Sequence, residues 1–137
     1  MRAKEAELAF ERLYEARGYE AGGRAICRVA RSLLPLTSYG AQDRRYIRSY
    51  LEVCERALEG ALDPDALLGG VPRNLEPYLE RIGWYFTEYD SHESIGANAI
   101  RSMALVVYRT KNESDLYQER LLAPISKKIA KVIASDQ

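Results

Sequence analysis

Few side chains of this sequence are of the types that perform covalent or metal chemistry. The one histidine, His92, lies in a polar segment, and the two cysteines, Cys27 and Cys54, stand far apart in the chain. Zinc sites need several His or Cys ligands at defined spacing, and a cysteine nucleophile needs a base beside it. No phosphate-loop, dinucleotide-binding, nucleophile-elbow or metalloprotease motif occurs. We therefore expect a protein that is not an enzyme and has no cofactor and no metal. We expect His92 to cap a helix and both thiols to be buried.

Arginine supplies the positive signal, because its distribution along the chain is uneven. Residues 17–56 carry eight Arg against four acids, and residues 57–96 carry eight acids against two Arg, although the whole chain has 20 basic and 20 acidic side chains. Tyrosine is also abundant and supplies 10 of the 13 aromatic residues. Arg and Tyr are both frequent in protein interfaces. Sorted charge of this kind indicates surfaces and partners rather than catalysis.

Six arginines and two tyrosines of the basic block lie on two predicted neighbouring helices. On the first helix the arginines recur at i, i+4 and i+7 and share one face. On the second they crowd the first turns, with two tyrosines between or beside them. If the turn at residues 35–40 folds the two helices antiparallel, these side chains form one patch. The candidate partner-binding patch consists of Arg24, Arg28, Arg31, Arg44, Arg45, Arg48, Tyr46 and Tyr50.

Several readings of this patch remain open. Arginine with interleaved aromatic rings suits an acidic protein surface, and it equally suits a phosphate backbone with stacked bases. A solvated face with local salt bridges has the same pattern. The acidic 57–96 segment can also meet the basic 17–56 segment of another copy, in a ring, a filament or a two-fold dimer. We predict a non-catalytic interaction protein whose partner is a protein or a second copy. The alternative is a subunit of a nucleoprotein complex that binds the backbone of DNA or RNA.

Apolar residues at helical spacing predict the elements that position the patch. We expect an all-α fold, a compact bundle of about six to seven helices, with residues 1–137 as a single domain. Its core consists of the helices at 41–60, 75–89 and 93–110. The predicted helices cover residues 3–17, 23–34, 41–60, 75–89, 93–110, 113–122 and 125–134, with a single helical turn at 64–68.

Glycine, proline and tryptophan mark particular points in these helices. Gly18 ends the first helix, and the pair Gly22–Gly23 marks a break or a close approach of two helices. Gly83 lets a neighbouring helix come close, and Trp84 beside it is predicted to anchor the core. Pro124 is predicted to separate the last two helices.

The location of the protein follows from what the sequence lacks. No apolar run approaches the 18 residues of a membrane span, and the first 15 residues are charged throughout, without the apolar centre of a signal peptide. We therefore expect a cytoplasmic protein with no membrane partner. Two cysteines are too few for a disulfide framework and remain thiols in a reducing compartment.

Overall fold

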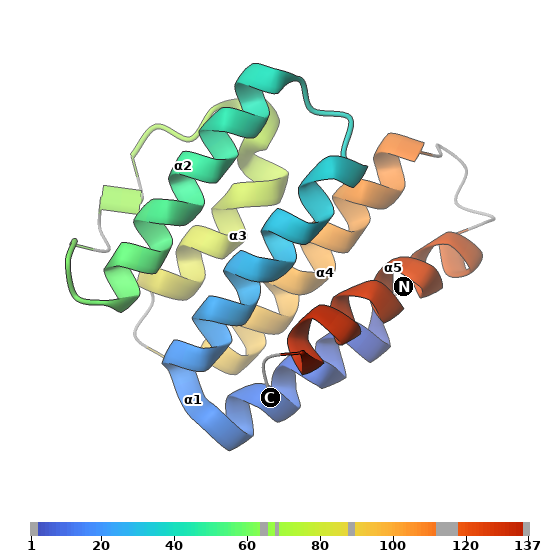
Figure 1. The fold of residues 1–137 in the computed structure, drawn as a ribbon, viewed down its shortest axis with the longest axis horizontal. Helices are drawn as coiled ribbons and strands as arrows, with labels where there is room; N and C mark the ends of the chain where they lie inside the picture. The colour runs from blue at the N-terminus through green and yellow to red at the C-terminus, as the bar shows by residue number, and fades with distance from the viewer. Residues whose placement is uncertain (1–2, 64–65, 68, 88–89, 112–117, 136–137) are drawn as a thin grey trace.

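In the computed structural model, which describes residues 3–63, 66–67, 69–87, 90–111 and 118–135, the chain is all-helical (Figure 1). The all-α prediction is confirmed, although five α-helices are described here rather than six to seven. The predicted turn at 64–68 lies partly outside the described residues. The elements are α1 (Lys4–Leu33), the 3-10 turn η1 (Leu34–Leu36), α2 (Ala41–Leu58), the 3-10 turn η3 (Arg73–Leu75), α3 (Glu76–Thr87), α4 (His92–Lys111) and α5 (Gln118–Ala134).

The first two predicted helices form the single kinked element α1. Gly18 has φ 83° and ψ −164°, a conformation outside the helical region that glycine adopts without steric cost. The predicted end of the first helix corresponds to this kink. The helix resumes at once, so the Gly22–Gly23 pair lies inside it as a point of close approach. A Cβ on Gly22 would lie 2.5 Å from the Tyr85 hydroxyl oxygen, which shows how tightly α3 packs there.

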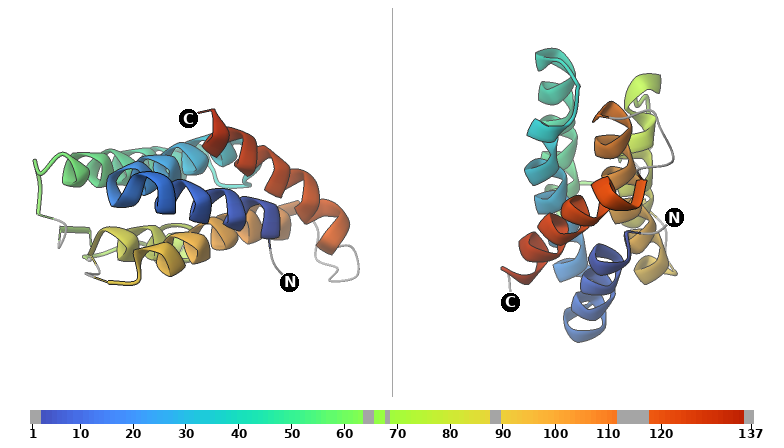
Figure 2. Two further views of the ribbon diagram at one scale, coloured as in Figure 1. Left: turned by 90° about the horizontal axis from the view of Figure 1, so that it is seen from below. Right: turned by 90° about the vertical axis from the view of Figure 1, so that its right-hand side faces the viewer.

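The helices are arranged in two layers (Figure 2). The second half of α1 and α2 run antiparallel in one layer, and α3 and α4 form the other. The centre of the bundle differs from the prediction, because α1 packs against α2, α3, α4 and α5. Its buried residues include Phe10, Ile26 and Leu33. Among the described residues, no helix combines the length and apolarity needed to cross a membrane.

Pro124 lies inside α5 and does not end it, so the predicted boundary there is wrong. A proline inside a helix removes one backbone hydrogen bond and is normally unfavourable. Here α5 packs against α1, burying Ile125, Ile129 and Ile133. The buried Ser126 Oγ also accepts a hydrogen bond of 2.9 Å from the Ala6 N–H of α1. This tertiary packing outweighs the local cost of the proline. The start of the predicted 113–122 helix lies outside the described residues.

Buried tyrosines connect the two layers. The Tyr78 hydroxyl of α3 donates to the Ala30 carbonyl oxygen of α1 at 2.6 Å, and the Tyr85 hydroxyl donates to the Tyr19 carbonyl oxygen at 2.6 Å. The Tyr85 ring also stacks on the Tyr19 ring, with centroids 5.1 Å apart. Both α3 rings are fully buried. The excess of tyrosine is thus used in part inside the fold, where each phenol satisfies its polar tip on a helix carbonyl.

The buried phenols predict a loss of stability at alkaline pH. Burial raises the pKa of Tyr50, Tyr78 and Tyr85 above the ordinary value of 10.0. Above pH 10 the unfolded chain therefore loses protons that the folded chain retains, and the free energy of unfolding falls as pH rises. The expected slope is up to about 1.4 kcal/mol per pH unit for each tyrosine. Urea denaturation at pH 8, 10 and 11 measures it.

Tyr78→Phe isolates one of these contributions. The variant should lose about 1 kcal/mol at pH 8, the net value of one hydrogen bond. Its free energy of unfolding should also fall less steeply above pH 10, by the share of one phenol. Parallel slopes in the wild type and the variant would show that Tyr78 ionises alike in both states.

Candidate functional site

Two of the predicted patch residues, Arg24 and Arg31, form ion pairs within the α1–α2 layer. The Arg24 Nη2 lies 2.7 Å from the Glu20 Oε1 one turn earlier on α1, and Arg31 pairs with Glu55 of α2. Both pairs are partly exposed, and such pairs contribute little to stability. Arg31 therefore faces the helix seam, whereas Arg24 keeps half of its side chain in solvent.

Arg28 and Arg44 are drawn further into the protein. Arg28 is half-buried, and this burial lowers the pKa of its guanidinium. Arg44 is also half-buried, and its Nη2 donates to the Thr37 carbonyl oxygen at 3.0 Å. This hydrogen bond holds the loop between η1 and α2. Neither side chain is fully presented to a partner.

Arg45 and Arg48 are the exposed members of the patch. Both lie in the first half of α2 with exposed side chains. Within the part of the chain that the structure describes, no acidic side chain forms an ion pair with either of them. Their guanidinium groups are therefore open to an external partner.

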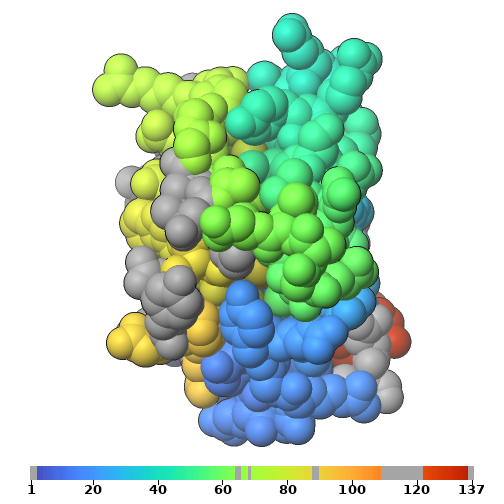
Figure 3. Space-filling view, turned by 90° about the vertical axis from the view of Figure 1, so that its left-hand side faces the viewer, coloured from blue at the N-terminus to red at the C-terminus, as the bar shows by residue number. Residues whose placement is uncertain are grey.

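The patch tyrosines, Tyr46 and Tyr50, lie on another flank of α2. The Tyr46 hydroxyl donates to the Gly70 carbonyl oxygen at 3.4 Å, and the Tyr50 hydroxyl donates to the Leu67 carbonyl oxygen at 3.3 Å. Tyr50 is only 8% exposed. Figure 3 shows the described part of the 59–72 segment lying between α2 and α3 on this face. Both tyrosine hydroxyl groups are thus bonded to carbonyl oxygens of that segment.

Helix geometry explains how the five patch residues of α2 are divided. Residues two apart on an α-helix are rotated by about 200° around its axis, so their side chains point about 160° apart. Arg44 and Arg48 are each two residues from Tyr46, and Arg48 is two residues from Tyr50. That spacing was present in the sequence and indicates opposite flanks. Arg48 therefore lies on the flank of α2 opposite to the two tyrosines, whereas Arg45, one residue before the exposed Tyr46, lies between the two flanks.

A second surface, which the patch prediction missed, centres on Trp84. This side chain is 38% exposed, so the prediction that it anchors the core is wrong. The Arg81 guanidinium carbon lies 5.5 Å from the centroid of the Trp84 ring, a cation–π contact. Two apolar residues near Trp84 on α3, Ile82 and Phe86, are buried in the core instead.

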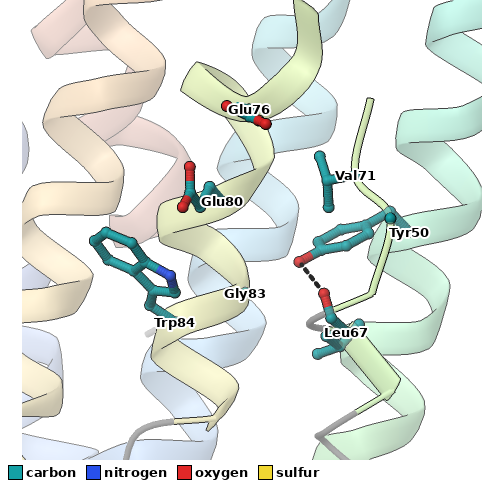
Figure 4. Close-up of a pocket in the computed structure, with 8 residues that line it drawn as sticks. Tyr50, Leu67, Val71, Glu76, Glu80, Gly83 and Trp84 are labelled. Atoms are coloured by element: carbon teal, nitrogen blue, oxygen red, sulfur yellow. Dashed lines mark hydrogen bonds between the residues drawn. The ribbon is translucent and has the colours of Figure 1, made fainter. Parts of the chain in front are cut away.

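Trp84, Glu80 and Glu76 form a ridge along α3 that separates two hollows. Their spacing of four residues places them in one line, and we call this line the Trp84 ridge. One hollow, of about 220 Å³, lies between the ridge and the 67–71 segment (Figure 4). The other, of about 440 Å³, lies between α3 and α4. The first is lined by Tyr50, Leu67, Gly70, Val71 and Gly83 besides the ridge, and the second by Pro77, Arg81, Arg101, Ser102, Leu105 and Val106.

Gly83 fixes the wall of the smaller hollow. A Cβ at Gly83 would collide with the Tyr50 hydroxyl oxygen, so α2 and α3 approach each other here only because residue 83 is glycine. The predicted close approach at Gly83 is confirmed. The neighbouring residue on α2 is Tyr50, whose hydroxyl also donates a hydrogen bond to the Leu67 carbonyl oxygen.

Gly83→Ala should therefore destabilise the protein despite the higher helix propensity of alanine. We expect a loss of about 1–3 kcal/mol from overpacking, measured by urea denaturation. In a Tyr50→Phe background the hydroxyl is absent, and the cost of Gly83→Ala should shrink. An equal cost in both backgrounds would mean that the Tyr50 hydroxyl does not limit the approach.

The described residues also place the chemically reactive side chains. Cys27 and Cys54 are both buried thiols, as predicted, and burial raises the pKa of Cys54. His92 is the first residue of α4, and its ring packs 4.6 Å from the ring centroid of Tyr19. No group of three or more His, Cys, Asp or Glu side chains suited to a metal occurs in the described part of the chain.

The chain shows no significant similarity to a known protein. No protein-family model, no curated protein and no solved structure matches the chain significantly.

Proposed function

We propose that this protein is a non-catalytic helical interaction protein that binds an acidic surface of a protein partner or of a second copy. The binding surface we propose is the exposed part of the arginine patch, Arg45 and Arg48 on α2. The observation that carries the proposal is the exposure of Arg45 and Arg48 without an ion pair among the described residues.

The place of these arginines in α2 supports a role in binding. The amino-terminal end of a helix carries partial positive charge, which disfavours nearby cations. Arg44 and Arg45 lie within the first five residues of α2, where Asp43 is the only acid to offset them. Arg45 therefore gains no stability from its own helix end. An external acidic surface supplies the counter-charge that the fold does not.

The position of the tyrosines favours a protein partner over single-stranded nucleic acid. Binding of single strands depends on aromatic rings that stack with bases beside a basic groove. Tyr50 is buried, and Tyr46, which is 37% exposed next to Arg45, has its hydroxyl bonded to the Gly70 carbonyl oxygen. At most one of the two patch rings is thus available to stack with a base, and nucleic acid remains the alternative.

Charge reversal of Arg45 and Arg48 tests the proposal. Affinity capture from nuclease-treated cell extract, followed by mass spectrometry, should recover partners with the wild-type protein. The Arg45→Glu/Arg48→Glu variant should recover at least about tenfold less, because the attraction becomes repulsion. Sedimentation velocity over a range of protein concentrations measures self-association in the same variant.

Lys127→Glu/Lys128→Glu provides the matched control. These lysines are exposed on α5, and the double change alters the net charge equally. This control should retain the partners, and circular dichroism should show unchanged helicity in both variants. Equal capture or self-association by both variants would contradict the proposal. Binding that is seen only when nucleic acid is present, and that weakens steeply with salt, would support the nucleic-acid alternative instead.

A further inference from the structure

The Trp84 ridge shares no residue with the arginine surface and has a different chemistry. Trp84 is the single tryptophan of the chain, and it keeps 38% of its surface exposed. Removing a large aromatic side chain from water is strongly favourable. Burial of the exposed part of Trp84 by a partner therefore contributes favourable free energy to binding. Tryptophan is also enriched among the residues that contribute most of the binding free energy in interfaces.

The polar groups of the smaller hollow are suited to a cation. Glu76 and Glu80 line it, and neither carboxylate forms an ion pair with a described residue. The Tyr50 hydroxyl is directed at the Leu67 carbonyl oxygen (Figure 4). The groups left for a ligand are thus negatively charged acceptors. Leu67 and Val71 supply apolar contact for the stem of a long side chain.

Trp84 already receives a guanidinium group in the free protein. Arg81, which lines only the hollow on the α4 side, holds its guanidinium carbon 5.5 Å from the ring centroid. The Trp84 ring, which lies beside the carboxylates of Glu76 and Glu80, attracts a cation placed in the smaller hollow by the same cation–π interaction. Tryptophan and carboxylates together are therefore complementary to arginine or lysine.

The larger hollow has a mostly polar lining, but one part of it offers apolar contact to a neighbour of that cation. Pro77, Leu105 and Val106 contribute apolar surface, and its volume of about 440 Å³ is twice that of the smaller hollow, about 220 Å³. Arg101 at its edge has its own partners, with Nη2 2.7 Å from the Asn98 Oδ1 and Nε 3.9 Å from the Glu7 Oε1. Its charge is thereby partly neutralised within the protein.

We infer that the Trp84 ridge is a docking surface for a basic, apolar-bearing segment of a partner protein. An arginine or lysine side chain of that segment occupies the smaller hollow against Glu76, Glu80 and Trp84. An adjacent apolar side chain lies against Pro77 and Leu105 at the α3–α4 hollow. The inference does not depend on the arginine surface, which takes a partner of opposite charge.

Trp84 provides a direct reporter, because its fluorescence has no contribution from another tryptophan. The probe is the peptide acetyl-Leu-Arg-Leu-amide, titrated into the full chain at low salt. We expect a saturable change in emission with a Kd of about 1 mM or tighter, the range expected for a few contacts. The peptide acetyl-Leu-citrulline-Leu-amide has the same shape without charge and should bind at least about fivefold more weakly. Equal affinity for both peptides, or no saturable change, would overturn the inference.

Two double variants locate the binding site. Glu76→Gln/Glu80→Gln should weaken binding of the arginine peptide by about fivefold to tenfold, since two carboxylates lose their charge. Glu52→Gln/Glu59→Gln removes one exposed acid in α2 and one directly after it and should leave the affinity unchanged. If both double variants lose affinity equally, the peptide binds by net charge alone and the inference fails. Circular dichroism establishes that both variants fold.

A third variant separates this inference from the proposed function. Arg45→Glu/Arg48→Glu should bind the arginine peptide as tightly as the wild-type protein, because neither residue lines the hollows. Loss of partner capture by this variant with retained peptide binding supports both surfaces independently. Trp84→Ala, followed by calorimetry, should abolish peptide binding. Retained binding in that variant would also overturn the inference.

Discussion

The hydrogen bonds from buried tyrosines of α3 to backbone carbonyls of α1 are the interaction on which the rest of the structure depends. Tyr78 and Tyr85 each donate at 2.6 Å to an α1 carbonyl oxygen, on Ala30 and Tyr19 respectively. Such bonds form only where the helices are close, and Gly22 leaves the space that the Tyr85 hydroxyl occupies. Because an unpaired buried phenol is costly, these bonds fix both the rotation and the position of α3 against α1.

The orientation of α3 determines which of its side chains reach the surface. With Tyr78, Ile82 and Tyr85 committed to the core, Trp84 lies on the solvent side together with Glu80. Gly83 then faces α2 and admits the Tyr50 hydroxyl, which in turn holds the Leu67 carbonyl oxygen. The Trp84 ridge and its two hollows are therefore a consequence of how the tyrosines are buried.

Some arginines of the α1–α2 layer interact with groups of the protein itself, and others are exposed to solvent. Arg24 and Arg31 form ion pairs with glutamates of the same layer. Arg44 donates a hydrogen bond to the Thr37 carbonyl oxygen in the loop before α2. Arg45 and Arg48 remain in solvent. The acidic residues Glu76 and Glu80 lie on the other layer, in α3. The basic part of the sequence thus contributes exposed arginines to α2, and the acidic part contributes the glutamates of the Trp84 ridge to α3.

The sequence by itself determined the helical class, most helix bounds and the buried thiols, because these follow from local periodicity and from hydrophobicity. It also indicated an interruption at Gly18, although as the end of a helix, whereas the structure has a kink there within the continuous α1. Only the tertiary structure decided that α5 continues through Pro124, that Trp84 is exposed and that the hydroxyl groups of Tyr46 and Tyr50 bond to the carbonyl oxygens of Gly70 and Leu67. These outcomes depend on contacts between residues far apart in the chain. A hydrophobic pattern indicates which side chains prefer burial, but the packing of whole helices decides which of them obtain it.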